Sequence, residues 1–368
     1  MIISIPKELN SGETRVSLSP KACAKLIQDG YEIRIENGAG QSAFFDDASY
    51  QAQGCKVSAD KASLLAGAQV IVKVGIPTLE EIQALPEKSI YIGFLNPLAQ
   101  PELTQALNTR GITAFSMELV PRISRAQSAD ALSSQANIGG YKAALLAAEQ
   151  LPKFFPMLTT AAGTIPPAKV LIIGVGVAGL QAIATARRLG SIVSAYDIRP
   201  EVKEQVHSLG AEFVEANIDE AGSGEGGYAK EVSEETKQKL QAALEKVVSE
   251  SDVIITTAQV PGKKAPVLLT RAMVESMRAG SIVIDMAAGQ GGNVEPSQPN
   301  QDVDVQGVRV MGPTNLPASM PLHASELYSK NISTLLQLMV KDGAINLNFE
   351  DDIIKGACVC HAGQIRTK

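Results

Sequence analysis

The chain has 368 residues, of which 45% are hydrophobic and 20% are charged, and its formal net charge is −6. This length is sufficient for two domains of ordinary size, and the composition excludes a disordered protein. Because the chain is acidic overall and contains no long run of Lys or Arg, a nucleic acid or an anionic membrane is not expected as its main partner.

The two ends of the sequence bear on its compartment and on metal binding. Met1 leads directly into a predicted strand at residues 2–5 without an export signal, and no apolar stretch reaches the roughly 20 residues that span a bilayer, so we expect a cytoplasmic protein. Four cysteines in a chain of this length do not form a disulfide framework. Cys358 and Cys360 stand beside His361, but this group lacks a fourth ligand, so a structural strand is favoured over a metal or redox site.

The N-terminal region of the chain alternates short apolar runs with helical patterns. Ser19 and Pro20 together predict the start of a helix, with a capping side chain and a proline at the first position. Such alternation is typical of a largely parallel sheet covered on both faces. Gly38 and Gly40 precede neither a long helix nor an acidic strand end, so we expect no dinucleotide in this domain. The predicted strands are residues 2–5, 32–35, 70–74, 90–92 and 113–115.

The central motif of the sequence is a glycine turn between a strand at residues 170–173 and an amphipathic helix at residues 180–189. In this order the first glycine permits a tight turn, the second lets backbone N–H groups approach a pyrophosphate, and the third lets the helix pack on the strand. The alternative is a glycine-rich turn that only packs a strand–helix–strand unit. The predicted dinucleotide contacts in the turn are Gly174, Val175, Gly176, Val177 and Gly179.

An acidic residue follows the next predicted strand, residues 191–196. At the end of this strand the Asp197 carboxylate can accept hydrogen bonds from both ribose hydroxyls, and it would repel a 2′-phosphate. Arg199 weakens the second argument because it carries a positive charge two residues further on. The pattern favours NAD(H) over NADP(H), with Asp197, Ile198 and Arg199 as predicted contacts.

The remaining elements complete two doubly wound α/β domains, both Rossmann-like and joined by long helices. We expect the first domain to comprise residues 1–132 and 319–368, and the NAD(H)-binding domain to comprise residues 133–318. The glycine-rich residues 216–230 form either a mobile flap or an insertion without function. The predicted long helices are residues 133–151 and 322–340, a shorter helix is residues 201–209, and the strands are residues 212–214, 253–256, 281–285 and 308–311, with residues 345–347 as a last strand in the first domain.

Several stretches together resemble the NAD(H)-binding domain I, or alpha, subunit of proton-translocating NAD(P) transhydrogenase, a family related to alanine dehydrogenase. The resemblance covers essentially the whole chain and indicates the split-subunit form of the enzyme. It rests on residues 6–8 with 12–16, and on residues 120–128, 133–137, 174–179 with 196–199, 226–231, 261–266 and 291–293.

The resemblance implies that the loop at residues 120–130 lies beside the nicotinamide ring. It assigns catalytic roles to Arg122, Gln127 and Asp130, and cofactor contacts to Arg122, Ser124, Arg125, Gln127 and Ser133. From the residues alone, the loop offers a cation, an amide and a carboxylate just ahead of a helix, and such groups can equally be helix caps and surface ion pairs.

Four further cofactor contacts and several partners are expected as well. Gly227 and Tyr228 are expected in a lid over the nucleotide, and Ala258 and Gln259 at the carboxyl edge of the sheet. NADP(H) is expected on a partner domain only, and a membrane-spanning domain on another chain. The chain is expected to form a homodimer and to be peripheral to the inner membrane, on its cytoplasmic side, through its partner subunits.

Alanine dehydrogenase activity is the competing enzymatic interpretation. Hydride transfer between two nicotinamide rings requires no acid or base, whereas oxidation of an amino acid does. At the positions aligned with the catalytic His and Asp of alanine dehydrogenases, this chain has Asn96 and Gly289. Arg15 and Lys73 match that family's ligands for the substrate carboxylate. A third interpretation is a non-catalytic module that senses NAD(H).

Overall fold

The computed structural model describes residues 1–215, 234–259, 262–341 and 343–367, and for residues 234–240 it describes the backbone alone. The chain forms two compact units: unit 1 comprises Met1–Ala136 and Pro317–Lys368, and unit 2 comprises Asn137–Leu316. We expected one domain boundary between residues 132 and 133 and another between residues 318 and 319. Whether the chain separates there into independently folding domains stays a prediction. No helix within the described ranges is long and apolar enough to cross a bilayer.

Unit 1 is built on an 8-stranded sheet with the order β19-β18-β6-β5-β4-β1-β2-β3. The strands β1 to β6 all run parallel, so their spatial order is 3-2-1-4-5-6, which is the doubly wound arrangement. The strands are β1 (Ile2–Ile5), β2 (Glu32–Glu36), β3 (Lys56–Ser58), β4 (Val70–Val72), β5 (Ile90–Gly93), β6 (Thr113–Ser116), β18 (Cys358–His361) and β19 (Gln364–Ile365).

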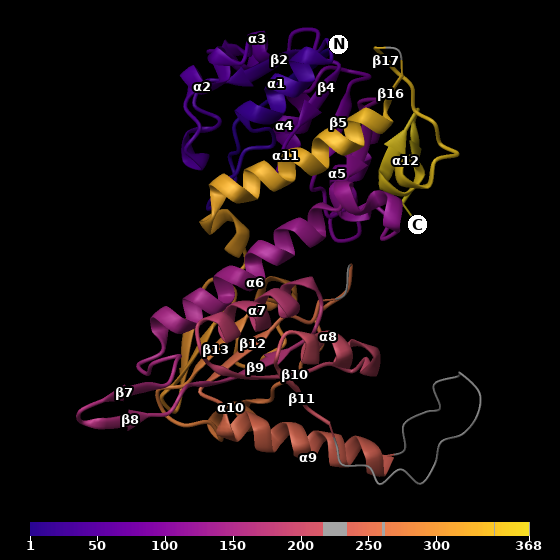
Figure 1. Ribbon diagram of the computed structural model, residues 1–368. Helices are drawn as coiled ribbons and strands as arrows, with labels where there is room; N and C mark the ends of the chain where they lie inside the picture. The colour runs from indigo at the N-terminus through magenta and orange to yellow at the C-terminus, as the bar shows by residue number, and fades with distance from the viewer. Residues whose placement is uncertain (216–233, 260–261, 342, 368) are drawn as a thin grey trace. The chain divides into compact units, whose positions relative to one another are not determined.

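Helices cover both faces of this sheet (Figure 1). Successive side chains of a strand point to opposite faces, so the buried strands supply apolar residues to two separate cores. On one face α1 and α11 pack against Val70, Val72 and Phe115, and on the other α4 and α5 pack against Ile71 and Tyr91. The helices are α1 (Pro20–Gln28), α2 (Asp47–Ala52), α3 (Lys61–Leu65), α4 (Leu79–Ala84), α5 (Pro101–Thr109), α11 (Pro321–Leu338) and α12 (Asp352–Ala357).

The C-terminal segment that joins the sheet of unit 1 is not the one predicted from the sequence. Residues 345–347 were expected in this sheet, but β17 (Ala344–Ile345) pairs only with β16 (Val340–Lys341) in a separate 2-stranded sheet. The prediction was wrong because Ile345 is exposed, whereas a strand inside this sheet needs both faces buried. The segment Cys358–His361, which was predicted to be a structural strand, fills that place instead and pairs antiparallel with β6.

Unit 2 repeats the arrangement with a 7-stranded sheet in the order β11-β10-β9-β12-β13-β15-β14. All neighbours are parallel except β14, which runs antiparallel to β15 at the edge. The fold predicted from the sequence, two largely parallel Rossmann-like domains, is confirmed. The strands are β9 (Lys169–Ile173), β10 (Ile192–Tyr196), β11 (Glu212–Phe213), β12 (Val253–Thr256), β13 (Ile282–Asp285), β14 (Asp302–Val305) and β15 (Val308–Met311).

Two layers of helix enclose the sheet of unit 2 as well. On one face Ala143 and Ala147 of α6 and Ile183 of α7 pack against the strands, and on the other face Leu244 and Val248 of α9 do so. The hairpin of β7 (Leu158–Thr160) and β8 (Gly163–Ile165) stands apart from the sheet. The helices are α6 (Ala131–Gln150), which has residues in both units, α7 (Val177–Arg188), α8 (Lys203–Ser208), α9 (Glu234–Glu250) and α10 (Arg271–Glu275).

Candidate functional site

The order of the strands in unit 2 reverses between β9 and β12, and the glycine turn lies at this point. The Thr257 backbone N–H donates to the carbonyl oxygen of Ile173 (2.8 Å), and its hydroxyl donates to the carbonyl oxygen of Gly174 (2.8 Å). In open α/β sheets such a reversal leaves a crevice at the carboxyl ends of the strands, where ligands bind. The sequence motif therefore lies where this topology offers a site.

The three glycines of the turn differ in what a side chain at each position would contact. Gly174 has φ +94°, and a Cβ there would lie 2.8 Å from the Thr257 hydroxyl oxygen. At Gly179 a Cβ would lie 1.9 Å from the carbonyl oxygen of Gly174, so only glycine lets α7 approach β9 this closely. A Cβ on Gly176 would meet nothing within 4 Å. The fold thus requires the first and third glycines, while the second borders open space.

The start of α7 offers positive potential to that space. Gly176 is the N-cap residue, and no side chain accepts a hydrogen bond from the first turn of the helix. Val177, the first residue of the helix, is 40% exposed. Backbone N–H groups at an uncapped helix N-terminus and the helix dipole both favour an anion, as a phosphate would be.

Asp197 ties the end of β10 to the glycine turn. Its Oδ2 accepts from the backbone N–H of Val175 (2.7 Å), and its Oδ1 accepts from the backbone N–H and the Nε of Arg199 (2.9 and 3.0 Å). Burial raises the pKa of the carboxyl, but the hydrogen bonds from Arg199 and Val175 prevail and leave its pKa below the ordinary value. The group is therefore ionised at neutral pH. Ile198, between the pair, is exposed.

Ala258 and Gln259 follow β12 and complete this edge of the sheet. The Gln259 Nε2 donates to the carbonyl oxygen of Met286 (2.8 Å). The backbone N–H and carbonyl of Ala258 are both bound by the carboxamide of Asn293, a residue to which the sequence reasoning gave no role of its own. The only sequence signal for it was the Gly-Gly-Asn stretch at residues 291–293.

The structure places the predicted nicotinamide loop in unit 1, and the glycine turn, Asp197 and Ala258 in unit 2. In the loop, Asp130 accepts from the backbone N–H (2.9 Å) and the hydroxyl (2.5 Å) of Ser133 at the start of α6. Arg125 forms an ion pair with Asp351 (2.6 Å). These two residues thus make the cap and the surface ion pair that were the alternative interpretation.

The other predicted loop residues point toward solvent. Arg122, Ser124 and Gln127 are exposed, around the short η3 helix (Ser124–Ala129). Their side chains are therefore accessible to a ligand. Gly227 and Tyr228, the predicted lid residues, lie outside the residues that the structure describes.

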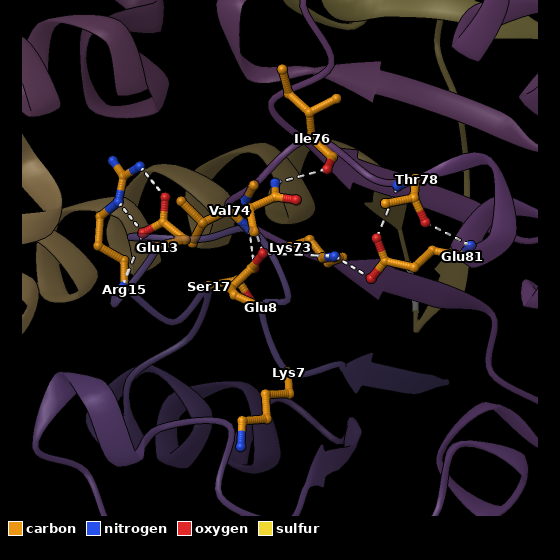
Figure 2. A network of polar contacts seen from close by, with 12 residues as sticks. Lys7, Glu8, Glu13, Arg15, Ser17, Lys73, Val74, Ile76, Thr78 and Glu81 are labelled. Carbon is orange, nitrogen blue, oxygen red and sulfur yellow. Dashed lines mark hydrogen bonds and ion pairs between the residues drawn. The ribbon is translucent and has the colours of Figure 1, made fainter. Parts of the chain in front are cut away.

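Unit 1 has the same strand reversal between β1 and β4, but buried charges fill it (Figure 2). Glu8 accepts from the backbone N–H groups of Val74 (2.6 Å) and Gly75 (3.0 Å), and its Oε2 lies 3.7 Å from the Nζ of Lys73. The Lys73 Nζ is closer to Glu81, at 2.5 Å. Burial of Glu8 outweighs the opposing effect of Lys73 and raises the pKa of its carboxyl to about 7.

Arg15, the other candidate ligand for a carboxylate, is also engaged inside unit 1. Its guanidinium pairs with Glu13 (2.6 Å) and donates to the Oε1 of Gln135 (2.9 Å). A Cβ on Gly75 would lie 2.6 Å from the Asn10 side-chain nitrogen, so little space remains beside it. Both cations that match the substrate ligands of alanine dehydrogenase are therefore neutralised by carboxylates of this chain.

The positions aligned with the acid and base of alanine dehydrogenase hold neither function. Asn96 donates its backbone N–H to Glu118 (2.9 Å), and Gly289 lies in a short helical turn against Thr314. Among the described residues, no group of three or more His, Cys, Asp or Glu side chains is arranged to hold a metal ion.

Comparison with known families agrees with this arrangement of two Rossmann-like units. A family model described as alanine dehydrogenase/PNT, N-terminal domain, matches residues 4–139, and the corresponding C-terminal domain model matches residues 143–368. The chain therefore belongs to the alanine dehydrogenase/PNT family.

Within that family, the chain is 44% identical over 370 residues to NAD(P) transhydrogenase subunit alpha of Cereibacter sphaeroides, covering 99% of this chain and 71% of that protein. A crystal structure of transhydrogenase from Sinorhizobium meliloti superposes with a TM-score of 0.91 at 41% identity, over 99% of this chain and 100% of that one. A structure of L-alanine dehydrogenase superposes with a TM-score of 0.84 at 28% identity, over 99% and 96% of the two chains.

Proposed function

We propose that this chain is the NAD(H)-binding subunit of a proton-translocating NAD(P) transhydrogenase of the Re/Si-specific type. The observation that carries the proposal is the edge of unit 2, where an uncapped helix start, open space at Gly176 and the ionised Asp197 adjoin one another. The identity of 44% with a transhydrogenase subunit alpha supports this choice within the family.

The residues at this edge fit NAD(H). The N–H groups from Gly176 to Gly179 at the start of α7 receive the pyrophosphate, and the Asp197 carboxylate accepts hydrogen bonds from the adenosine ribose. Ile198 and Arg199 flank that ribose, and Ala258 and Gln259 border the cofactor from the neighbouring strand.

The chemistry needs alignment and no proton transfer by the protein. When bound, NADH supplies a hydride, which passes from its C4 to the C4 of NADP+ on a partner domain. Arg122 and Gln127 orient the nicotinamide ring, and Asp130 fixes the loop at the start of α6 through Ser133. Ser124 and Arg125 complete the contacts of the loop.

The proposal includes partners that this chain lacks. A membrane-spanning domain and an NADP(H)-binding domain on other chains couple hydride transfer to proton movement, and two copies of this chain form a homodimer. Through these partners the subunit is held at the cytoplasmic face of the inner membrane.

The competing functions are less well supported. An alanine dehydrogenase requires a free cationic site for a carboxylate and an acid–base group, whereas here Lys73 and Arg15 are ion-paired and Asn96 and Gly289 stand at the acid–base positions. A module that only senses NAD(H) would explain the edge of unit 2, but it would give no reason for the exposed Arg122 and Gln127.

The test combines the purified chain, NADH and an NADP(H)-binding partner domain. Stopped-flow absorbance should show hydride transfer that depends on both proteins, while the chain alone should not oxidise alanine with NAD+. Failure to bind NADH, or alanine turnover without the partner, would overturn the proposal. Binding of NADH without transfer to the partner would leave the sensing module as the function.

A variant of the nicotinamide loop tests the assignment of residues. Gln127→Asn should slow hydride transfer at least tenfold at saturating NADH and change the Kd of NADH less than threefold, because the shorter amide no longer reaches the ring. Gln51→Asn, an exposed glutamine of α2, serves as the matched control and should change neither. Equal losses of affinity and rate in Gln127→Asn would contradict the assigned role.

A further inference from the structure

We infer that Asn293 is a positioning residue of the nucleotide site: its buried carboxamide fixes the backbone of Ala258, and with it the distance between the segment after β12 and the glycine turn. This inference rests on the proposed function, since it concerns how tightly the same edge of unit 2 holds NADH. Asn293 itself is fully buried, and its side chain forms hydrogen bonds with the backbone of Ala258 and Pro266.

The side chain of Asn293 binds both polar groups of one backbone residue. Its Oδ1 accepts from the N–H of Ala258 (3.0 Å), and its Nδ2 donates to the carbonyl oxygens of Ala258 (2.9 Å) and Pro266 (2.8 Å). Only a carboxamide carries an acceptor and two donors in this geometry. An aspartate at the same place would set a negative charge against two carbonyl oxygens.

Asn293 is in turn held by a buried carboxylate. Asp285, the last residue of β13, is fully buried and accepts from the backbone N–H groups of Asn293 (3.0 Å), Ala287 (3.0 Å) and Val294 (3.3 Å), and from the hydroxyl of Thr256 (3.0 Å). Hydrogen bonds from four donors to one buried side chain restrict the movement of the loop that carries it. The loop after β13 is therefore a rigid support for the carboxamide.

The other backbone group of Asn293 is fixed as well. Its carbonyl oxygen accepts from the N–H groups of Leu268 (2.8 Å) and Leu269 (3.0 Å). With N–H, carbonyl and side chain all bonded, Asn293 has no freedom to follow a movement of Ala258. Any movement of Ala258 must therefore break these hydrogen bonds.

The position of Ala258 determines the space at the glycine turn. A Cβ on Gly174 would lie 3.0 Å from the backbone nitrogen of Ala258, so the two segments are already in close contact. Thr257, the preceding residue, donates its hydroxyl to the carbonyl oxygen of Gly174. A shift of Ala258 by a few tenths of an ångström therefore acts directly on the turn that carries the pyrophosphate-binding N–H groups.

The test measures NADH affinity and hydride transfer separately in Asn293→Ala. We expect the Kd of NADH, from its fluorescence on titration, to rise about tenfold, while the transfer rate to the partner domain at saturating NADH falls less than threefold. A residue with a structural role alone would lower the melting temperature and leave the Kd of the folded fraction unchanged. That result, or equal losses in rate and affinity, would overturn the inference.

Two further variants keep the inference falsifiable if Asn293→Ala folds poorly. Thr257→Val removes the hydroxyl that joins the same segment to Gly174 and should also raise the Kd of NADH, by about threefold to tenfold. Asn108→Ala removes a single carboxamide hydrogen bond in unit 1, from its Nδ2 to the carbonyl oxygen of Gly363, and should leave the Kd unchanged.

The outcomes separate this inference from the proposed function. If the wild-type chain does not bind NADH, the proposed function fails and the inference fails with it. If the wild-type chain binds NADH and Thr257→Val and Asn293→Ala bind it equally well, the proposed function stands and only the inference is overturned.

Discussion

Units 1 and 2 have the same order of parallel strands, but among the described residues the turns at the two reversals differ in the space beside them. In unit 2 a Cβ on Gly176 would meet open space, whereas in unit 1 a Cβ on Gly75 would lie 2.6 Å from the side chain of Asn10 and 2.9 Å from Glu8. Topology alone therefore does not make a binding site. The side chains that follow the strands decide whether the crevice is open or filled.

The helices that leave the two reversals show the same difference. In unit 1, Ser19 caps α1, and Thr78 with Glu81 forms a capping box on α4. In unit 2, Thr270 caps α10 after β12, but no side chain caps α7. The N–H groups that an anion would bind are thus left accessible at the start of α7.

The largest expected effect comes from removing the buried cation of unit 1. Lys73→Met leaves Glu8 and Glu81 without their shared ammonium group, at a site where Lys73 is 2% exposed. We expect a loss of about 3–5 kcal/mol in the free energy of unfolding, measured by chemical denaturation. NADH affinity should not change while the protein stays folded.

The control for Lys73→Met is Lys56→Met, which breaks an ion pair with Glu32 in the same unit where Lys56 is 64% exposed. Its effect should stay below about 1 kcal/mol. If the two substitutions lowered the free energy of unfolding equally, Lys73 would contribute no more to stability through Glu8 and Glu81 than an exposed lysine does through its ion pair.

A smaller loss of stability is expected from substitutions of two glycines in unit 2. Gly179 is needed for the packing of α7 on β9, whereas Gly176 borders open space. Gly179→Ala places a methyl group 1.9 Å from a backbone oxygen and should cost about 1–3 kcal/mol of stability. Gly176→Ala, at a position with open space, should cost less than about 1 kcal/mol. Both should weaken NADH binding at least tenfold, as measured by fluorescence titration, and normal binding by Gly176→Ala would contradict the assigned phosphate site.

The last expected effect is a pH dependence that arises in unit 1. The pKa of Glu8 is about 7 in the folded chain against 4.5 as its ordinary value, because burial outweighs the attraction of Lys73 and the N–H groups of Val74 and Gly75, and Glu13 adds repulsion. The folded state therefore binds this proton more tightly. The resulting stability is fully present below pH 4.5 and is lost as the pH rises through about 7.

Denaturation midpoints measured between pH 5 and pH 8.5 test this sign. Glu8→Gln should flatten the decline, whereas Glu102→Gln, an exposed residue of α5, should leave it unchanged. A wild-type midpoint that declines no more than that of Glu8→Gln over this range would show that Glu8 is ionised throughout.

Local patterns in the sequence were sufficient to predict much of this fold. The buried strands appear as apolar runs, Ser19 and Pro20 begin α1 as expected, and the glycine turn lies between β9 and α7. These features depend on residues near one another in the chain. Both parallel sheets follow from them.

Features that depend on distant residues escaped the sequence reasoning. The edge strand β14 and the hairpin of β7 and β8 have no strong apolar pattern, and the pairing of Glu8 with Lys73 joins residues 65 positions apart. Asn293 was missed because a single buried amide has no periodicity. Its role is visible only once Ala258 and Asp285 are placed beside it.

The antiparallel contact of β18 with β6 has a consequence for biosynthesis. Until Cys358–His361 emerge from the ribosome, β6 presents an open edge, because β18, which pairs with that edge, follows all of unit 2 in the chain. Unit 2 is continuous in the chain and is complete earlier in translation. The nascent polypeptide therefore carries an unfinished sheet, with one edge of β6 unpaired, throughout the synthesis of unit 2.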